Sequence, residues 1–145
     1  MHEIRTQIEI EATAEQVWEV LTDFAAYPEW NSVMWPDGGE VRSGARLRVR
    51  VRMPGGLRVK FQPIVRRAER GRELCWHGRL PARLLEGVHY FTIEPLGENR
   101  VRFVQREVYA GILAPIYIRV MEGWVRRAYQ EMNRELKLRS ERVWA

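Results

Sequence analysis

Apolar and polar residues alternate over several short stretches of the chain before residue 111. The clearest stretch covers residues 45–53, where Leu47, Val49 and Val51 share one parity and arginines occupy the other. Side chains point alternately to the two faces of a strand, so this period of two predicts a half-buried strand. The same pattern predicts further strands, whereas residues 33–41 show no clear period and could hold a short strand. The further predicted strands cover residues 4–11, 57–61, 74–78, 87–95 and 101–109.

Helical patterns appear near both ends of the chain. Thr13 and Gln16 have the spacing of a capping box, which predicts a helix from about Ala14 to Leu21. A second short helix or turn should follow over residues 24–30, because this segment contains a proline that breaks a regular helix. After Gly111 the apolar residues recur at three- and four-residue steps. They are Leu113, Tyr117, Val120, Trp124, Ala128, Met132 and Leu136.

The last of these patterns predicts a helix from about Ile112 to Arg139, roughly 40 Å long at about 1.5 Å per residue. Only a curved sheet offers such a helix a groove of matching length. The predicted order is therefore one strand, two short helices, a run of antiparallel strands and a long helix. This order predicts an α+β, helix-grip fold, in which a curved antiparallel sheet of six to seven strands wraps around the C-terminal helix.

Motifs spread over nearly the whole chain point to a known group of proteins. They are Tyr27-Pro28-Glu29-Trp30-Asn31, residues 72–78 (RELCWHG), 87–91 (GVHYF) and 105–111 (QREVYAG), and Met132-Asn133. Through them the chain resembles the SRPBCC superfamily, the START-like or Bet v 1-like group, and most closely its polyketide cyclase/dehydrase-like members. The resemblance implies one domain over residues 1–145, with a ligand cavity between the sheet and the C-terminal helix. It implies little about function, because the superfamily includes lipid carriers, cyclases and hydrolase-like enzymes.

Composition narrows the classes of protein that remain. The 145 residues carry a net charge of +5, and 46% of them are hydrophobic. There is no apolar run long enough for a transmembrane helix, and the N-terminus lacks the apolar core of a signal peptide. The single cysteine, Cys75, permits no internal disulfide and no cysteine cluster for a metal. We therefore expect a cytoplasmic protein. No phosphate loop, nucleophile elbow, dinucleotide fingerprint or metal-ligand spacing occurs, so no cofactor or metal is expected.

Candidate chemistry lies on the two strands of the last predicted hairpin. A turn at residues 97–99 would place His89 opposite Glu107 and Phe91 opposite Gln105, with all four side chains facing the interior. A buried imidazole and carboxylate need partners, and the neighbouring carboxylate would favour the imidazolium. The pair is then either a satisfied structural contact or, lining the cavity, a general base or a substrate anchor.

Large side chains elsewhere are candidates for the wall of the ligand cavity or, equally, for plain core packing. The amide of Asn31 could either cap a turn or bind a ligand carbonyl. Residues 80–86 and 111–115 break the strand pattern and could frame an opening at one end of the molecule. The other candidates for the cavity wall are Trp30, Trp76, Tyr109, Leu113, Tyr117 and Trp124.

The outer face of the two predicted strands between residues 45 and 61 is basic. Its residues are Arg46, Arg48, Arg50, Arg52, Arg58 and Lys60. Aromatic residues do not interleave with them, which argues against binding of single-stranded nucleic acid. The face is either solvated or the docking surface of an acidic partner, such as an acyl carrier protein or an anionic membrane.

Three functions follow from these features. The first is binding of a small hydrophobic or aromatic, lipid- or polyketide-like ligand in the cavity, with Asn31, His89, Gln105 and Glu107 orienting its polar groups. The second is an enzyme similar to a polyketide cyclase/dehydratase, in which His89 and Glu107 transfer protons. The third is an interaction module that acts through the basic face. The sequence does not indicate an oligomeric state.

Overall fold

A computed structural model describes residues 2–143, and its α+β architecture confirms the predicted helix-grip fold. The elements in chain order are β1 (His2–Ile10), α1 (Ala14–Thr22), the 3-10 helix η1 (Phe24–Glu29), β2 (Met34–Gly38), β3 (Arg48–Arg52), the 3-10 turn η2 (Pro54–Gly56), β4 (Arg58–Phe61), β5 (Ile64–Glu69), β6 (Glu73–Arg79), the 3-10 turn η3 (Pro81–Arg83), β7 (Glu86–Gly97), β8 (Arg100–Ala110) and α2 (Ala114–Val143). None of the helices in these residues is long and apolar enough to cross a membrane.

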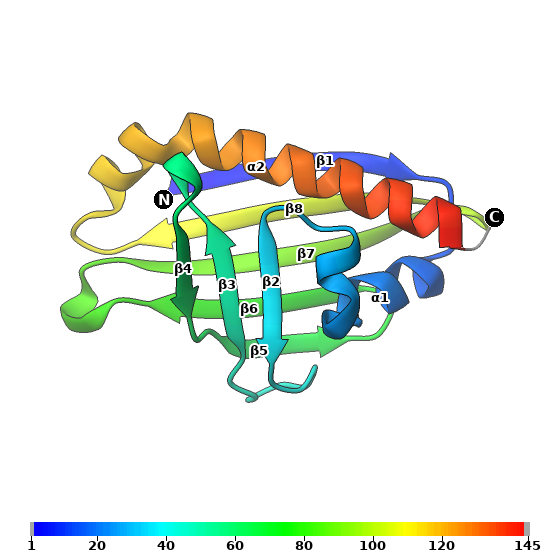
Figure 1. The fold of residues 1–145 in the computed structure, drawn as a ribbon, viewed down its shortest axis with the longest axis horizontal. Coiled ribbons are helices and arrows are strands. Elements are labelled where there is room, and N and C mark those ends of the chain that lie inside the picture. The colour runs from blue at the N-terminus through cyan, green and yellow to red at the C-terminus, as the bar shows by residue number, and fades with distance from the viewer. Residues whose placement is uncertain (1, 144–145) are drawn as a thin grey trace.

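The strands form two antiparallel sheets that pack around α2. The large sheet has the order β1-β8-β7-β6-β5, and the small sheet has the order β2-β3-β4. In Figure 1 the small sheet crosses in front of the large one, and α2 runs along β1 and β8. Backbone hydrogen bonds from Leu47 to Pro63 and from Val65 to Ala45 join the two sheets at one edge. The enclosed space between the sheets and α2 is where the predicted cavity should lie.

The predicted strand count of six to seven is too low, since residues 2–143 form eight strands. The sequence pattern misses β5 because a bulge between Val65 and Arg67 interrupts its alternation. Residues 33–41, which gave no clear period, contain β2, whose pairing with β3 is likewise shifted between Pro36 and Gly38. A bulge adds one residue to a strand and reverses the parity beyond it, which hides the period of two.

The predicted start of the first helix is confirmed in detail. The Thr13 hydroxyl accepts the backbone N–H of Gln16 at 3.1 Å, and the Gln16 side chain accepts the backbone N–H of Thr13 at 2.9 Å. These reciprocal bonds satisfy two donors that a helix start otherwise leaves unpaired. With its N-terminus capped in this way, α1 buries Val17 and Trp18 among its core-facing residues.

The C-terminal helix begins two residues later than predicted and presents a different stripe at its start. Val120 is 72% exposed and Leu113 lies before the helix on the surface, although both belong to the predicted apolar series. Successive residues of a helix are about 100° apart, so a stripe through Tyr117 and Trp124 turns Val120 toward solvent. Farther along, the buried stripe widens to include Tyr129, which the predicted series left out.

The predicted inward face of β4 is only partly right. Val59 and Phe61 line the cavity, but Val59 remains 42% exposed and Leu57 is 67% exposed. The reason is position, since β4 is the last strand of the small sheet and has no neighbour on its outer side. An edge strand covers less of its own apolar surface than a central strand does.

The basic face is outward, as the alternation predicts, but much of its charge is balanced. Asp37 of β2 contacts both Arg48 at 3.6 Å and Arg50 at 3.4 Å, and Arg52 contacts Glu131 of α2 at 3.1 Å. These acids lie outside the two strands on which the basic face was predicted. Their presence favours a solvated face. Docking of an acidic partner on this face stays a prediction.

Candidate functional site

A cavity of about 290 Å³ lies between the two sheets and α2. Most of its wall is apolar or aromatic, and the aromatic part comes from both sheets and from the helix. The aromatic residues are Phe61, Trp76, Tyr109, Tyr117, Trp124 and Tyr129. The polar part includes His89 and Glu107 side by side on β7 and β8. The cavity is therefore a hydrophobic container with a small cluster of polar groups on one wall.

The structure separates the predicted site residues into two groups. Trp76, His89, Glu107, Tyr109, Tyr117 and Trp124 line the cavity. The remainder lie elsewhere. Phe91 and Gln105 are buried in the core beside the cavity wall, Leu113 is on the surface, and Trp30 and Asn31 line a separate groove between η1 and the small sheet.

Asn31 acts as a turn cap, one of the two roles considered for it. Its side-chain oxygen accepts the backbone N–H groups of Val33 and Met34, each at 2.9 Å. This fixes the turn that leads from η1 into β2. The amide oxygen is thus occupied by the chain itself.

The predicted register of the last hairpin is confirmed. His89 pairs with Glu107, Phe91 pairs with Gln105, and Trp76 of the next strand lies opposite His89. The turn differs slightly, because a shift after Pro95 pairs Gly97 with Arg100. The irregularity lies at the turn end of the hairpin and does not reach the site.

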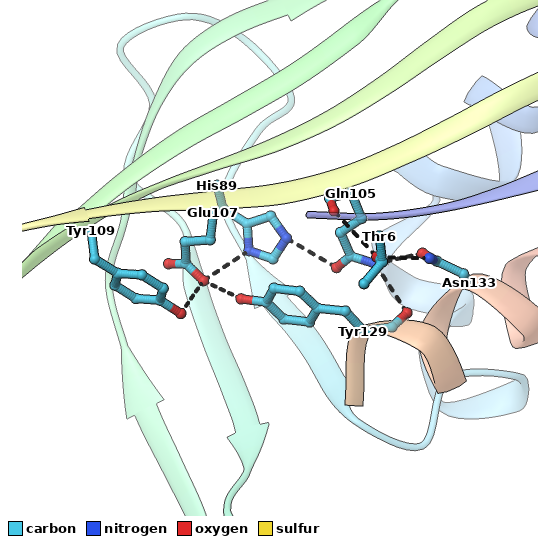
Figure 2. A network of polar contacts seen from close by, with 7 residues as sticks. All are labelled: Thr6, His89, Gln105, Glu107, Tyr109, Tyr129 and Asn133. Carbon is cyan, nitrogen blue, oxygen red and sulfur yellow. Dashed lines mark hydrogen bonds and ion pairs between the residues drawn. The ribbon is translucent and has the colours of Figure 1, made fainter. Parts of the chain in front are cut away.

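A chain of buried polar groups leads from His89 to α2 and β1, as Figure 2 shows. The Gln105 amide nitrogen donates to the backbone oxygen of Tyr129 at 3.4 Å and to the Asn133 side-chain oxygen at 2.7 Å. Asn133 in turn donates to the Thr6 hydroxyl at 2.9 Å, and Thr6 donates to the Gln105 backbone oxygen at 3.2 Å. The chain closes on itself, so each of these buried groups has a partner.

This chain determines which nitrogen of His89 must carry a hydrogen. A backbone oxygen can only accept, so the Gln105 nitrogen faces Tyr129 and the Gln105 oxygen faces His89. His89 Nε2 must then donate to that oxygen, at 2.9 Å. Burial lowers the pKa of His89 from 6.5, against the opposing influences of Glu107 and Gln105. A neutral imidazole with its proton on Nε2 follows.

Glu107 does favour the imidazolium, as expected, but it does not bond to the ring although the two residues are neighbours. His89 Nδ1 lies 3.8 Å from Glu107 Oε1, too far for a hydrogen bond, and in the neutral ring it carries a lone pair. Desolvation of a fully buried ring outweighs the attraction of one carboxylate. His89 gives Glu107 neither a proton nor a positive charge.

Glu107 is instead held by two tyrosines. The hydroxyls of Tyr109 and Tyr129 both donate to its Oε1, the former at 2.9 Å. Burial, and secondarily the Glu107 charge, raise the pKa of both hydroxyls, which keeps them protonated as donors. Tyr129 was absent from the predicted site. Its four-residue spacing from Val125 and Asn133 would have suggested it, had the stripe been drawn wider.

The second carboxylate oxygen of Glu107 is free. Among the residues that the structure describes, none forms a hydrogen bond with Oε2, and Figure 2 shows the dashed lines converging on the other oxygen. Gly87 makes room for it, since a Cβ there would lie 2.5 Å from Oε2. The absence of a side chain at Gly87 thus leaves one carboxylate oxygen available beside the cavity.

One end of the cavity is framed by the loop around η3 and the segment before α2. Leu80 and Leu85 line the cavity, and the Leu80 N–H donates to the Leu85 oxygen at 2.8 Å. Leu113 N–H donates to the Leu84 oxygen, also at 2.8 Å. Gly111, at φ +112°, lets the backbones approach, because a Cβ there would lie 2.8 Å from the Leu84 oxygen. Apolar side chains, among them Leu80, Leu84 and Ile112, are exposed at this end.

Within residues 2–143 there is no cluster of three or more His, Cys, Asp or Glu side chains that could hold a metal ion. The polar groups of the cavity can accept a hydrogen bond through Glu107 and transfer a proton to or from its carboxylate.

The sequence matches a protein-family model described as polyketide cyclase / dehydrase and lipid transport over residues 1–141. No curated protein matches the sequence.

Solved structures share the fold at low identity. The aromatase/cyclase Zhui from Streptomyces sp. R1128 is 18% identical with a TM-score of 0.81, covering 99% of this chain and 96% of that one. A START superfamily protein from Mycobacterium smegmatis is 20% identical with a TM-score of 0.73, and 99% of each chain is covered. The di-domain aromatase/cyclase BexL is 16% identical with a TM-score of 0.77, covering 97% of this chain and 47% of that one.

Proposed function

The chain belongs to the polyketide cyclase/dehydrase and lipid transport family, and on that premise we propose that it binds a small hydrophobic or aromatic molecule in the cavity beside Glu107. The observation that carries the proposal is the cavity itself. About 290 Å³ of space remains between well-packed sheets and helix, walled mainly by apolar and aromatic side chains. A mainly apolar pocket with a few convergent polar groups is the usual form of a small-molecule site, so this cavity favours an occupant.

The driving force for binding would be removal of apolar surface from water, at about 25 cal/mol per Å². The aromatic rings supply flat walls that suit a planar ligand. Glu107 and the tyrosines would orient its polar group. This division of work matches the usual design of ligand sites, in which apolar walls give affinity and a few polar groups give orientation.

Native mass spectrometry of the purified protein tests for a bound small molecule directly. A variant tests the location of binding. Ala128 is buried on α2 and lines the cavity, so Ala128→Leu should fill part of the space. We expect it to weaken binding of the neutral fluorescent probe N-phenyl-1-naphthylamine at least tenfold. Ala25→Leu, which adds the same atoms at an exposed position of η1, is the control. Equal affinity of both variants for the probe would show that the cavity is not the site.

A second candidate is an enzyme similar to a cyclase/dehydratase, favoured by the free oxygen of Glu107 in a water-poor setting. Glu107 would accept a proton from the substrate. Before that transfer, the Tyr109 and Tyr129 hydroxyls would stabilise the carboxylate by donating to its other oxygen. In that case Glu107→Gln should lower turnover about a hundredfold or more while ligand binding persists.

The variant His89→Gln is a second test of whether the site only binds a ligand or also catalyses a reaction. If the site only binds, the change in the buried wall around Glu107, worth about one hydrogen bond, should weaken affinity by no more than about tenfold. If His89 itself is a general base, turnover should fall about a hundredfold or more in the same variant. We expect the modest loss of affinity that a binding site predicts. The lone pair of the neutral ring is on Nδ1, which lies against Glu107 and so does not face a substrate.

A further inference from the structure

The charge of Glu107 has no positive counterpart at the site. Among residues 2–143, its only contact with a potentially cationic side chain is with His89, which is neutral. The two other charged residues that line the cavity are Arg79 and Glu86, which carry opposite charges. No lysine or arginine of the described chain forms an ion pair with Glu107. The interior of the cavity is therefore electrically negative.

The hydrogen-bonding capacity of the site is equally one-sided. The Tyr109 and Tyr129 hydroxyls donate their hydrogen bonds to Glu107 Oε1. His89 donates its N–H to the side-chain oxygen of Gln105, as the closed polar chain requires. What these groups leave open to an occupant is the Oε2 acceptor of Glu107, beside the space that Gly87 provides. A ligand that bonds to this oxygen must donate a proton rather than accept one.

Aromatic rings surround the same space. Trp76, Tyr109 and Tyr117 line it from the sheets and the start of α2, and the Tyr109 and Tyr117 ring centres are only 5.0 Å apart. The negative faces of such rings attract cations, and the attraction is greater where water is excluded. A negative carboxylate within an aromatic enclosure is the combination by which proteins bind alkylated and protonated amines.

We propose that the ligand of this cavity carries a protonated amine on an apolar, preferably aromatic, body, with the ammonium group on Glu107 Oε2 and the body against the aromatic walls. The inference rests on the proposed binding function and names the class of ligand for it. A carboxylate or phosphate group placed against this wall is disfavoured by the same arrangement, because it would meet Glu107 as a like charge.

The test uses three probes that share a naphthalene ring and a two-carbon side chain. They are 2-(1-naphthyl)ethylamine, 2-(1-naphthyl)ethanol and 1-naphthaleneacetic acid, and their dissociation constants are measured by calorimetry at pH 7. We expect the amine to bind at least tenfold more tightly than the alcohol, and the acid to bind most weakly. An alcohol that binds as tightly as the amine would overturn this inference and leave the proposed function intact.

Variants assign the preference to one carboxylate. In Glu107→Gln the amine and the alcohol should bind within about threefold of each other, because the charge is gone while the volume is kept. Glu98→Gln removes a carboxylate in the exposed turn between β7 and β8, away from the cavity lining, and should retain the full preference. A preference that survives Glu107→Gln contradicts the assignment. The comparison of probes on the wild-type chain decides the ligand class even if that variant does not fold. If none of the probes binds at millimolar concentration, the inference and the proposed function fail together.

Discussion

The hydrogen bonds of single residues in the site depend on the groups around them rather than on residue type alone. His89 and Glu107 lie opposite each other, as strand alternation and a short turn predict, yet each bonds to something else. Alternation determines which residues share a face, and the hairpin determines which are opposite. The partner of each polar atom depends on the rotation of α2, which brings Tyr129 and Asn133 to the sheet. No local pattern in the strands contains that information.

His89 should make the stability of the protein depend on pH. Its pKa is lowered from 6.5 by burial, whereas the unfolded residue keeps a value of about 6.5. Below that pH the unfolded chain binds a proton that the folded chain does not, so stability present above pH 6.5 is lost as the pH falls. We expect the free energy of unfolding by urea to decrease from pH 6.5 to 5.5 through this residue, by no more than the limit of about 1.4 kcal/mol per pH unit that one proton sets.

The variant His89→Gln isolates this effect. In it, the part of the pH-dependent decrease in unfolding free energy that comes from His89 should vanish. His2→Gln, at the start of β1, removes a histidine outside the core and should keep the wild-type pH dependence. Parallel pH profiles for wild type and His89→Gln would mean that His89 does not titrate as the structure implies.

The two tryptophans Trp18 and Trp124 should respond differently to truncation. Trp18 is buried in the core by α1, so Trp18→Ala should lower the free energy of unfolding by about 3–5 kcal/mol. Trp124 is half-buried and lines the cavity, so Trp124→Ala should lie at or below the low end of that range, at about 3 kcal/mol or less, and should weaken probe binding. Unchanged melting temperature together with unchanged binding in Trp124→Ala would contradict its place in the cavity wall.

At the scale of elements, the sequence predicts best where the signal is local. The capping box of α1 depends on residues three apart, and it is found in the structure as predicted. The strand β5 depends on its pairing with β6 and contains a bulge, so its own alternation is broken. The exposure of Val120 depends on which face of α2 meets the sheet, and a series of apolar residues alone does not select between adjacent stripes.

The cap of α1 gives a quantitative expectation. Thr13→Ala removes the hydroxyl that accepts the Gln16 N–H, and should lower the free energy of unfolding by about 1 kcal/mol. Thr13→Ser keeps the hydroxyl and serves as the control, with stability close to that of the wild type. Chemical denaturation of both variants measures the difference. An equal loss in the two would show that the threonine methyl, rather than the cap, contributes the stability.

The whole molecule depends on contacts between distant parts of the chain. α2 packs along β1 and β8 and closes one side of the cavity, so neither sheet is complete as a hydrophobic core without it. The predicted sheet-and-helix architecture could be drawn from the order of elements, because few topologies satisfy that order. The division into two sheets could not, since it depends on which strands pair with one another, and strand alternation does not contain that information.

Removal of α2 should therefore abolish cooperative folding. A chain that ends at Gly111 would expose the inward faces of β1, β7 and β8, and we expect it to show no cooperative transition in urea. A chain of residues 1–143 is the control and should unfold in a single transition. A cooperative transition of the shorter chain, with near-ultraviolet circular dichroism similar to that of the control, would contradict this expectation.

The pairing of β1 with β8 has a consequence for how the protein is made. His2 lies opposite Tyr109, so the first strand to leave the ribosome waits for the last strand of the sheet. At about 5–20 residues per second, roughly 5–20 s of translation separate the two. During that interval β1 is an unpaired strand that another nascent chain could join. Its outward residues Glu3, Arg5, Gln7 and Glu9 are charged or polar, a pattern that discourages such pairing until its own partner is synthesised.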